Sequence, residues 1–272
     1  MRIVLTALAL GLALAGGHAS AQSAGDDLAQ ARAAFEQRDF KTAYARYSAL
    51  TASPYGAEAA FVLSVIVKDG YGVVRADPAQ ALVLLRRAAD GGEPRAIGTL
   101  GMAYLEGDGV PQSLEEAKRV WRRGAELNQA PSLYNLGYMA RFADRAPAEA
   151  AGWFERAVAA GDTKSLSELA DLLDRGEGVA RDSARAVDLW RQAFAAGAKE
   201  PPTKLAQAFF EGSGVAEDAV KAQAWALVAE KAGNGVSLEA RNVIASKLSA
   251  DQRAEAARLA DRCLAAPSAD CP

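Results

Sequence analysis

Histidine is almost absent from this chain of 272 residues. Its one copy, His18, lies near the N-terminus. The rest of the chain has no imidazole to ligate a metal, to act as a general base or to activate a nucleophile. Cysteine is nearly as scarce: Cys263 and Cys271 are the two copies, and they do not form a Cys-x-x-Cys motif. We therefore expect a protein that is not an enzyme and that uses no metal and no cofactor.

An excess of positive charge is also missing. The chain has 31 basic and 34 acidic side chains, for a formal net charge of -3 at pH 7. A slightly acidic chain without a basic cluster is a poor ligand for the phosphate backbone of nucleic acids. We expect no nucleic-acid partner.

The N-terminal residues predict an export signal. Arg2 precedes an apolar run from Ile3 to Ala15, and Ala19-Ser20-Ala21 matches a small-x-small cleavage site, with cleavage expected after Ala21. The run is short for a bilayer span, although a retained anchor is the alternative. The sequence predicts a periplasmic or secreted protein with no integral membrane segment after processing. In that oxidising compartment, Cys263 and Cys271 are predicted to form an intrachain disulfide.

Two series of residues recur in phase along the chain. Small residues mark the first series at steps of 36, 33, 36 and 36, and each is followed four positions later by a turn residue. The markers are Ala88, Gly124, Ala157, Ala193 and Ala229, and the turn residues are Gly92, Asn128, Gly161, Gly197 and Gly233. The second series is Leu63-Ser64, Leu100-Gly101, Leu136-Gly137, Leu169-Ala170 and Leu205-Ala206. Two series per period predict two elements in each repeat of a stacked array.

Proline and glycine indicate that both elements are helices. Prolines stand just ahead of apolar-periodic runs, as in Asp77-Pro78, where Asp77 is the expected N-cap. After the first element of most repeats comes Gly-x-Gly-Val, as in Gly107-Asp108-Gly109-Val110. The second element carries an aromatic anchor at Trp121, Trp153, Trp190 or Trp225, with Leu85 near the corresponding place in the first repeat. We interpret these large side chains as packing between helices.

The order Leu-Gly-x-x-Tyr, Gly-x-Gly-Val, Asp, Ala, an aromatic residue, Ala and Gly resembles the Sel1-like repeat family, a relative of the tetratricopeptide repeat. Asp182, Ala186, Trp190, Ala193 and Gly197 match that pattern in one repeat. The resemblance implies an all-α fold, a right-handed α-solenoid of antiparallel helix pairs. The third repeat departs from the pattern, because it lacks the Gly-x-Gly-Val loop and is three residues shorter.

Four segments follow from these patterns. Residues 1–21 are the signal peptide, and residues 22–57 resemble a degenerate tetratricopeptide pair. Residues 58–234 hold five Sel1-like repeats, the third degenerate, and residues 235–272 contain C-terminal capping helices and a tail. A polar-faced capping helix is expected from Ser249 to Leu264, because repeat arrays need closed ends.

The sequence offers few candidates for chemistry. The Gly-x-Gly segments follow helices and lack Gly-Lys-Ser/Thr, so they are expected to be turns. Acid pairs such as Glu168 and Asp171 are expected on a solvated helix face, with Arg175 as an i,i+4 partner of Asp171. Some cysteine-rich members of the family have been linked to penicillin binding or β-lactamase activity. A cell-wall-active enzyme or peptidoglycan-binding protein is therefore the alternative, although Ser-x-x-Lys, Ser-Asp-Asn and Lys-Thr-Gly are all absent.

A partner protein is the leading hypothesis, bound in the concave groove of the array. Positions two before, two after and five after each repeat leucine form a stripe separate from the packing face. In chain order they are Phe61, Val65, Lys68, Gly98, Met102, Leu105, Tyr134, Tyr138, Arg141, Ser167, Asp171, Asp174, Thr203, Gln207 and Phe210. The candidate binding residues among them are Met102, Tyr134, Tyr138, Arg141, Asp171 and Gln207. For Tyr134 and Tyr138, packing against the shortened third repeat is an open alternative. The family resemblance implies roles in envelope regulation, complex assembly or host interaction.

Overall fold

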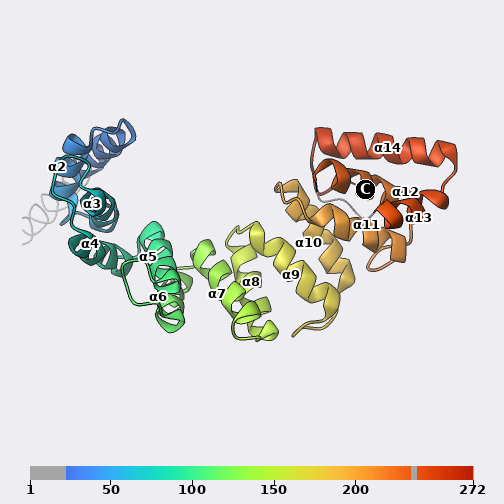
Figure 1. Ribbon diagram of the computed structural model, residues 1–272, viewed down its shortest axis with the longest axis horizontal. Coiled ribbons are helices and arrows are strands. Elements are labelled where there is room, and N and C mark those ends of the chain that lie inside the picture. Colours follow the sequence, from blue (N-terminus) through green and yellow to red (C-terminus); the bar gives the residue numbers. More distant parts are fainter. Residues whose placement is uncertain (1–22, 234–237, 272) are drawn as a thin grey trace, which may run out of the picture. The chain divides into compact units, whose positions relative to one another are not determined.

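The computed structural model describes residues 23–233 and 238–271. The predicted signal peptide and its cleavage site lie outside the described residues. The described residues are helical and contain no strand, and the helices follow one another as antiparallel pairs (Figure 1). This arrangement confirms the all-α class and the helix-pair repeat that the sequence predicted.

The chain divides into two compact units between Leu127 and Asn128. In the first unit, a helix at residues 23–36 precedes α2 (Phe40–Leu50), α3 (Gly56–Asp69), α4 (Pro78–Asp90), α5 (Pro94–Glu106) and α6 (Leu114–Glu126). The second unit contains α7 (Ala130–Phe142), α8 (Pro147–Ala159), α9 (Lys164–Arg175), α10 (Ser183–Ala195), α11 (Pro201–Glu211), α12 (Ala219–Lys231), α13 (Leu238–Ser246) and α14 (Ala250–Ala265).

The caps show why the helices begin and end where they do. The carboxylate of Asp77 accepts a hydrogen bond from the backbone N–H of Gln80 (2.9 Å), and Pro78 occupies the first turn of α4. Among the turn residues, Gly92 and Asn128 have positive φ angles of 83° and 53°. These observations confirm the boundaries that proline and glycine predicted.

In the last two Gly-x-Gly-Val loops, the second glycine lies against the backbone of the preceding repeat. A Cβ added at Gly178 would lie 2.2 Å from the backbone N of Ala148, in the first turn of α8. A Cβ at Gly214 would lie 2.3 Å from the carbonyl carbon of Ser183, in the first turn of α10. Glycine at these loops therefore permits the backbone of successive repeats to approach closely.

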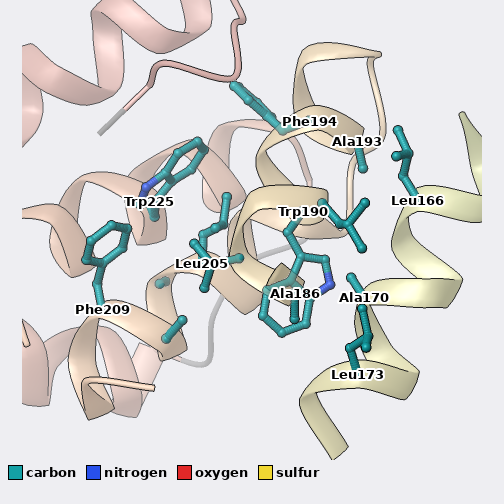
Figure 2. Close-up of a cluster of buried hydrophobic side chains, with 14 of the residues drawn as sticks. Leu166, Ala170, Leu173, Ala186, Trp190, Ala193, Phe194, Leu205, Phe209 and Trp225 are labelled. Carbon is teal, nitrogen blue, oxygen red and sulfur yellow. The ribbon is translucent and has the colours of Figure 1, made fainter. Parts of the chain in front are cut away.

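Large apolar side chains from consecutive helices form the core of the second unit (Figure 2). Trp190 and Trp225 are 3% and 1% exposed, and Trp225 packs edge to face on Phe194 with ring centroids 5.0 Å apart. The expected aromatic anchor of the third repeat is different. Phe154 is fully buried there, whereas Trp153 is half-buried and donates a hydrogen bond from Nε1 to Glu149 (3.0 Å). Phe154, and not Trp153, stands three residues before the repeat's small marker residue, as Trp121 does in the second repeat, and it therefore faces the core.

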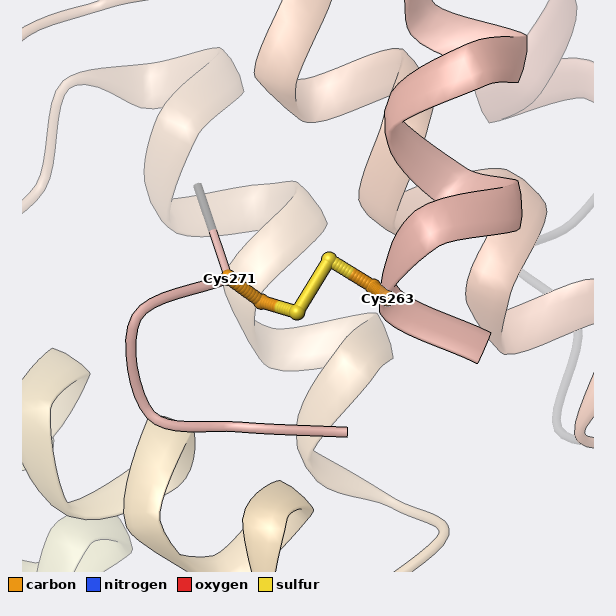
Figure 3. Close-up of a disulfide and its surroundings, with 2 residues drawn as sticks. All are labelled: Cys263 and Cys271. Atoms are coloured by element: carbon orange, nitrogen blue, oxygen red, sulfur yellow. A yellow bond between two sulfur atoms is a disulfide. The ribbon is translucent and has the colours of Figure 1, made fainter. Parts of the chain in front are cut away.

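The C-terminal end of the second unit is closed by α14, which packs on α12. Ser249 caps α14 through a capping box with Gln252, close to the predicted start of the helix. Cys263 on α14 is joined to Cys271 on the tail, with Cα atoms 5.7 Å apart (Figure 3). Both half-cystines are buried, and the bond ties the tail to the last helix.

Candidate functional site

The predicted stripe lines an open groove in the first unit. Phe61 and Val65 on α3, Leu82 and Leu85 on α4, and Met102 on α5 supply its apolar surface, and its volume is about 1020 Å³. We call this cavity the unit-1 groove. Its size is that of cavities which accept ligands or several side chains of a partner.

Charged side chains lie at the two ends of the unit-1 groove. At one end the guanidinium of Arg95 lies over the ring of Phe61, 4.7 Å from its centroid, and Arg95 Nε donates to Glu93 (2.6 Å). At the other end Lys68 Nζ lies 3.3 Å from a carboxylate oxygen of Asp108. The first halves of α3 and α5 therefore meet at one end and their C-terminal ends at the other, which means that the two helices run in the same direction.

The corresponding positions in the second unit are differently filled. Trp190 of α10 lies between two smaller clefts of about 360 and 470 Å³, and it borders both of them. Its indole N–H donates to Asp171 (3.3 Å), and Lys204 Nζ lies 3.9 Å from the same carboxylate. This part of the stripe is polar, and one indole ring borders both of its clefts.

Aromatic side chains follow one another along α7. Tyr134 and Tyr138 have ring centroids 6.2 Å apart, and Tyr138 and Phe142 have centroids 4.6 Å apart. Tyr138 is 40% exposed and Phe142 is 52% exposed. Tyr134 is half-buried and lies 6.1 Å from the ring of Phe154, and burial raises the pKa of its phenol. The sequence left two interpretations open for these tyrosines, packing in the third repeat or an accessible binding surface. Tyr134 packs in the third repeat, whereas Tyr138 remains accessible.

Arg141 is not the accessible side chain that the sequence suggested. Only 10% of it is exposed, and its Nη1 atom donates to the carboxylate of Glu168 on α9 at 2.5 Å. Burial raises the pKa of Glu168, although Arg141 opposes that shift. The expectation of a solvated acidic face is thus wrong for Glu168, because this carboxylate joins α9 to α7. The expected i,i+4 pair of Asp171 with Arg175 is present at 3.9 Å.

The structure separates the candidate binding residues into groups. Met102 lies in the unit-1 groove, and Tyr134 and Asp171 share the larger cleft of the second unit. Gln207 lines the smaller cleft and donates to Glu211 on its own helix (3.0 Å). The sequence reasoning did not select Phe142, or Leu85 as a lining residue. The signal for Leu85 was present, because this leucine stands where later repeats have an aromatic anchor.

Two kinds of feature are missing from the described residues. Nowhere among them do three histidine, cysteine or acidic side chains gather in a way that could hold a metal ion. In the same part of the chain, no helix combines the length and the apolar character needed to cross a bilayer.

Comparison with known proteins agrees with this architecture. The Sel1 repeat model matches residues 57–93, 96–129, 130–162, 163–197 and 203–234. A protective antigen of uropathogenic Escherichia coli strains, which displays an SLR fold, is 27% identical with a TM-score of 0.66. The match covers 84% of this chain and 50% of the antigen, so this chain spans half of the antigen's length. A Sel1 repeat protein from Oxalobacter formigenes has a similar fold, with 21% identity, a TM-score of 0.64, and coverage of 86% of this chain and 98% of that one. With five matched repeats over more than half of its residues, this chain belongs to the Sel1 repeat family.

Proposed function

We propose that this protein is an exported, non-enzymatic scaffold whose stripe of first-helix residues binds a segment of an envelope protein. Sel1 repeat proteins generally mediate protein–protein interactions. The observation that carries the proposal is the exposure of large side chains along the stripe and next to it. Met102 and Tyr138 are 38% and 40% exposed, and Phe142, one turn beyond Tyr138, is 52% exposed. Accessible aromatic side chains are the type that dominates binding energy at protein interfaces.

The helices that carry these side chains are held in place by their other faces. On α7, Leu133, Leu136 and Ala140 are buried against neighbouring helices, while Tyr138 points away from the core. A rigid binding surface loses little conformational entropy when a partner docks, so more of the contact energy remains as affinity.

Two features support an exported location. The N-terminal sequence has the charge, apolar run and small-residue site of a cleavable signal. The cysteine pair of the described residues is bonded, and such bonds persist in oxidising compartments. Mass spectrometry of the protein from the envelope fraction checks this part of the proposal. An N-terminal peptide beginning at Gln22 is expected, and a chain that retains Met1 in the cytosolic fraction contradicts export.

The binding surface is tested by crosslinking in cells. Tyr138→Ala with Phe142→Ala removes two exposed rings and should abolish crosslinks to the envelope partner that the wild type captures. Arg141 is left in place, because its ion pair with Glu168 is part of the fold. Val83→Ala is the matched control, since Val83 is 57% exposed on α4 outside the groove. Equal capture by a folded double variant and the wild type would overturn the assignment to α7.

A further inference from the structure

The first Sel1 repeat lacks the aromatic anchor of the later repeats. Leu85, Trp121, Phe154 and Trp190 each stand three residues before the repeat's small marker residue, and in the fifth repeat Trp225 stands four before it. Trp121, Phe154 and Trp190 are buried, whereas Leu85 is half-buried and lines the unit-1 groove. A leucine is too small to fill the space that an indole fills elsewhere in the array.

The fourth repeat shows what closes the same place. There Trp190 divides the stripe into two clefts of about 360 and 470 Å³, compared with about 1020 Å³ for the unit-1 groove. The residues at matching repeat positions also differ in polarity. Phe61, Val65 and Met102 in the first unit correspond to Ser167, Asp171 and Gln207 in the second. The unit-1 groove is therefore larger in volume than either cleft of the second unit, and its lining is more apolar.

An open apolar groove favours an apolar occupant. Phe61, Val65, Leu82 and Leu85 are half-buried, so part of each side chain faces the groove and not the core. A partner that covers this apolar surface gains hydrophobic stabilisation. Contiguous apolar surface of this kind marks sites of protein interaction when polar residues surround it.

Charge gives the groove a direction. Because α3 and α5 run in the same direction, their C-terminal ends, which carry partial negative charge, lie at the end that holds Glu106 and Asp108. Lys68 pairs with Asp108, and Glu106 is exposed. A cationic side chain of a bound segment is therefore favoured at this end.

The opposite end favours an anion. It combines the N-terminal ends of α3 and α5 with Arg95, whose side chain is 53% exposed. Arg95 uses Nε to bind Glu93 and has Nη2 3.7 Å from Glu58, and a guanidinium carries five N–H donors. The remaining N–H groups of Arg95 can therefore donate hydrogen bonds to a carboxylate of a bound segment.

From these observations we infer that the unit-1 groove is the docking site for an apolar segment of the partner protein, with a basic residue at its Glu106 end and an acidic residue at its Arg95 end. The inference rests on the proposed function and specifies the chemistry of the partner. The occupant's large apolar side chains lie over Leu85, Val65 and Met102. The charges at the two ends set the direction in which the segment lies.

The test is a selection from a random-peptide phage library on the purified, immobilised protein. Peptides with two large apolar residues flanked by one basic and one acidic residue are expected to be enriched. Leu85→Trp fills the groove with the residue type of the fourth repeat and should weaken binding of a selected peptide at least about ten-fold. Val83→Trp adds the same indole to an exposed site on α4 and should change the affinity less than about two-fold.

Two more variants keep the inference falsifiable if Leu85→Trp folds poorly. Val65→Asp places the acidic residue of the fourth repeat in the groove and should also weaken the selected peptides. Glu106→Lys should reduce the enrichment of basic residues and leave the apolar pair enriched. Peptides of acidic character, peptides insensitive to both groove substitutions, or the absence of any enriched peptide each overturn the inference.

Failure of this inference can be told apart from failure of the proposed function. If Leu85→Trp and Val65→Asp leave the wild-type crosslinks intact while Tyr138→Ala with Phe142→Ala removes them, the groove is not the docking site and the scaffold proposal stands. If neither substitution set changes the crosslinks, binding on the stripe is wrong in both units.

Discussion

Gly101 on α5 lies directly against the indole of Trp121 on α6. A Cβ at Gly101 would fall 2.2 Å from Trp121 Nε1 and 2.6 Å from its Cε2. Trp121 is 1% exposed, so its ring has no free space into which it could move. The small residue after the repeat leucine is therefore what allows the two helices of a repeat to pack around a buried indole.

Gly101→Ala should consequently destabilise the first unit, although alanine is the better helix former. We expect the free energy of unfolding to fall by about 1–3 kcal/mol, the usual cost of overpacking a core. Urea-induced unfolding monitored by circular dichroism measures the change. The control is Gly98→Ala on the same helix, where an added Cβ meets nothing within 4 Å and a gain of up to about 1 kcal/mol is expected. Equal stability of the two variants contradicts the packing role of Gly101.

Removing Arg141 should destabilise the second unit in a pH-dependent way. In Arg141→Leu the carboxylate of Glu168 loses its partner while it is still mostly buried, and a loss of about 1–3 kcal/mol is expected at neutral pH. Burial holds the pKa of Glu168 above the ordinary value of 4.5, and the loss of Arg141 raises it further. A raised pKa contributes stability that is present below 4.5 and is lost as the pH rises through the folded-state value.

The cost of Arg141→Leu should therefore be smaller near about pH 4 than near pH 7, where Glu168 must remain charged or take up a proton. Urea titrations at the two pH values give the comparison. Arg141→Leu combined with Glu168→Gln is the control, because an amide needs no ionic partner and should recover part of the loss at neutral pH. A cost that is independent of pH, or no recovery by the second substitution, contradicts the ion-pair account.

An ion pair in the first unit should respond to acid through a lowered pKa. Arg32 binds the carboxylate of Glu58 through Nε (2.7 Å) and Nη2 (2.5 Å), and this hydrogen bonding lowers the pKa of Glu58 below 4.5. The resulting stability is present above 4.5 and is lost as the pH falls through the lowered value. Arg32→Gln should cost less than about 1 kcal/mol at neutral pH, because 56% of the arginine side chain is exposed to solvent.

The free energies of unfolding of the wild type and of Arg32→Gln should converge in acid, once Glu58 is protonated in both proteins. Thermal melts of the wild type and of Arg32→Gln across the acidic range measure this convergence. Arg38→Gln is a useful control for the loss of one positive charge, since Arg38 lies in the turn after the first helix and should show no such trend. A difference that grows as the pH falls is incompatible with this assignment.

Loss of the disulfide should loosen the C-terminal end of the second unit. Cys263→Ala with Cys271→Ala opens a short loop whose closure is worth roughly 2.5 kcal/mol at most. Hydrogen exchange should increase in α14 and in α12, on which it packs, and not in the first unit, because repeat stability is passed between neighbours. Reductant should reproduce the effect in the wild type and have no effect on the double variant. Faster exchange spread over both units contradicts a local role.

Much of the fold could be predicted from the sequence because the same local signals recur in each repeat. Proline and aspartate at helix starts, glycine at turns, and a small residue after the repeat leucine all act over a few residues. Gly101 and Trp121 illustrate this, since both could be assigned to a packing face from their spacing alone. Local preferences and periodicity were sufficient to predict the helix pairs.

The tertiary structure decided which side chains of a face are free. By its position in the repeat, Arg141 was expected to be an accessible binding residue. It instead forms an ion pair with Glu168, which lies on another helix and 27 residues away in the sequence. Trp153 was the expected anchor, but the next residue on α8, Phe154, is the one that is fully buried, against Gly137 of α7. The unit-1 groove likewise exists because Leu85 does not fill the space between α3 and α5. Sequence determines helices through contacts a few residues apart, whereas burial and open volume depend on packing between helices that only the folded chain brings together.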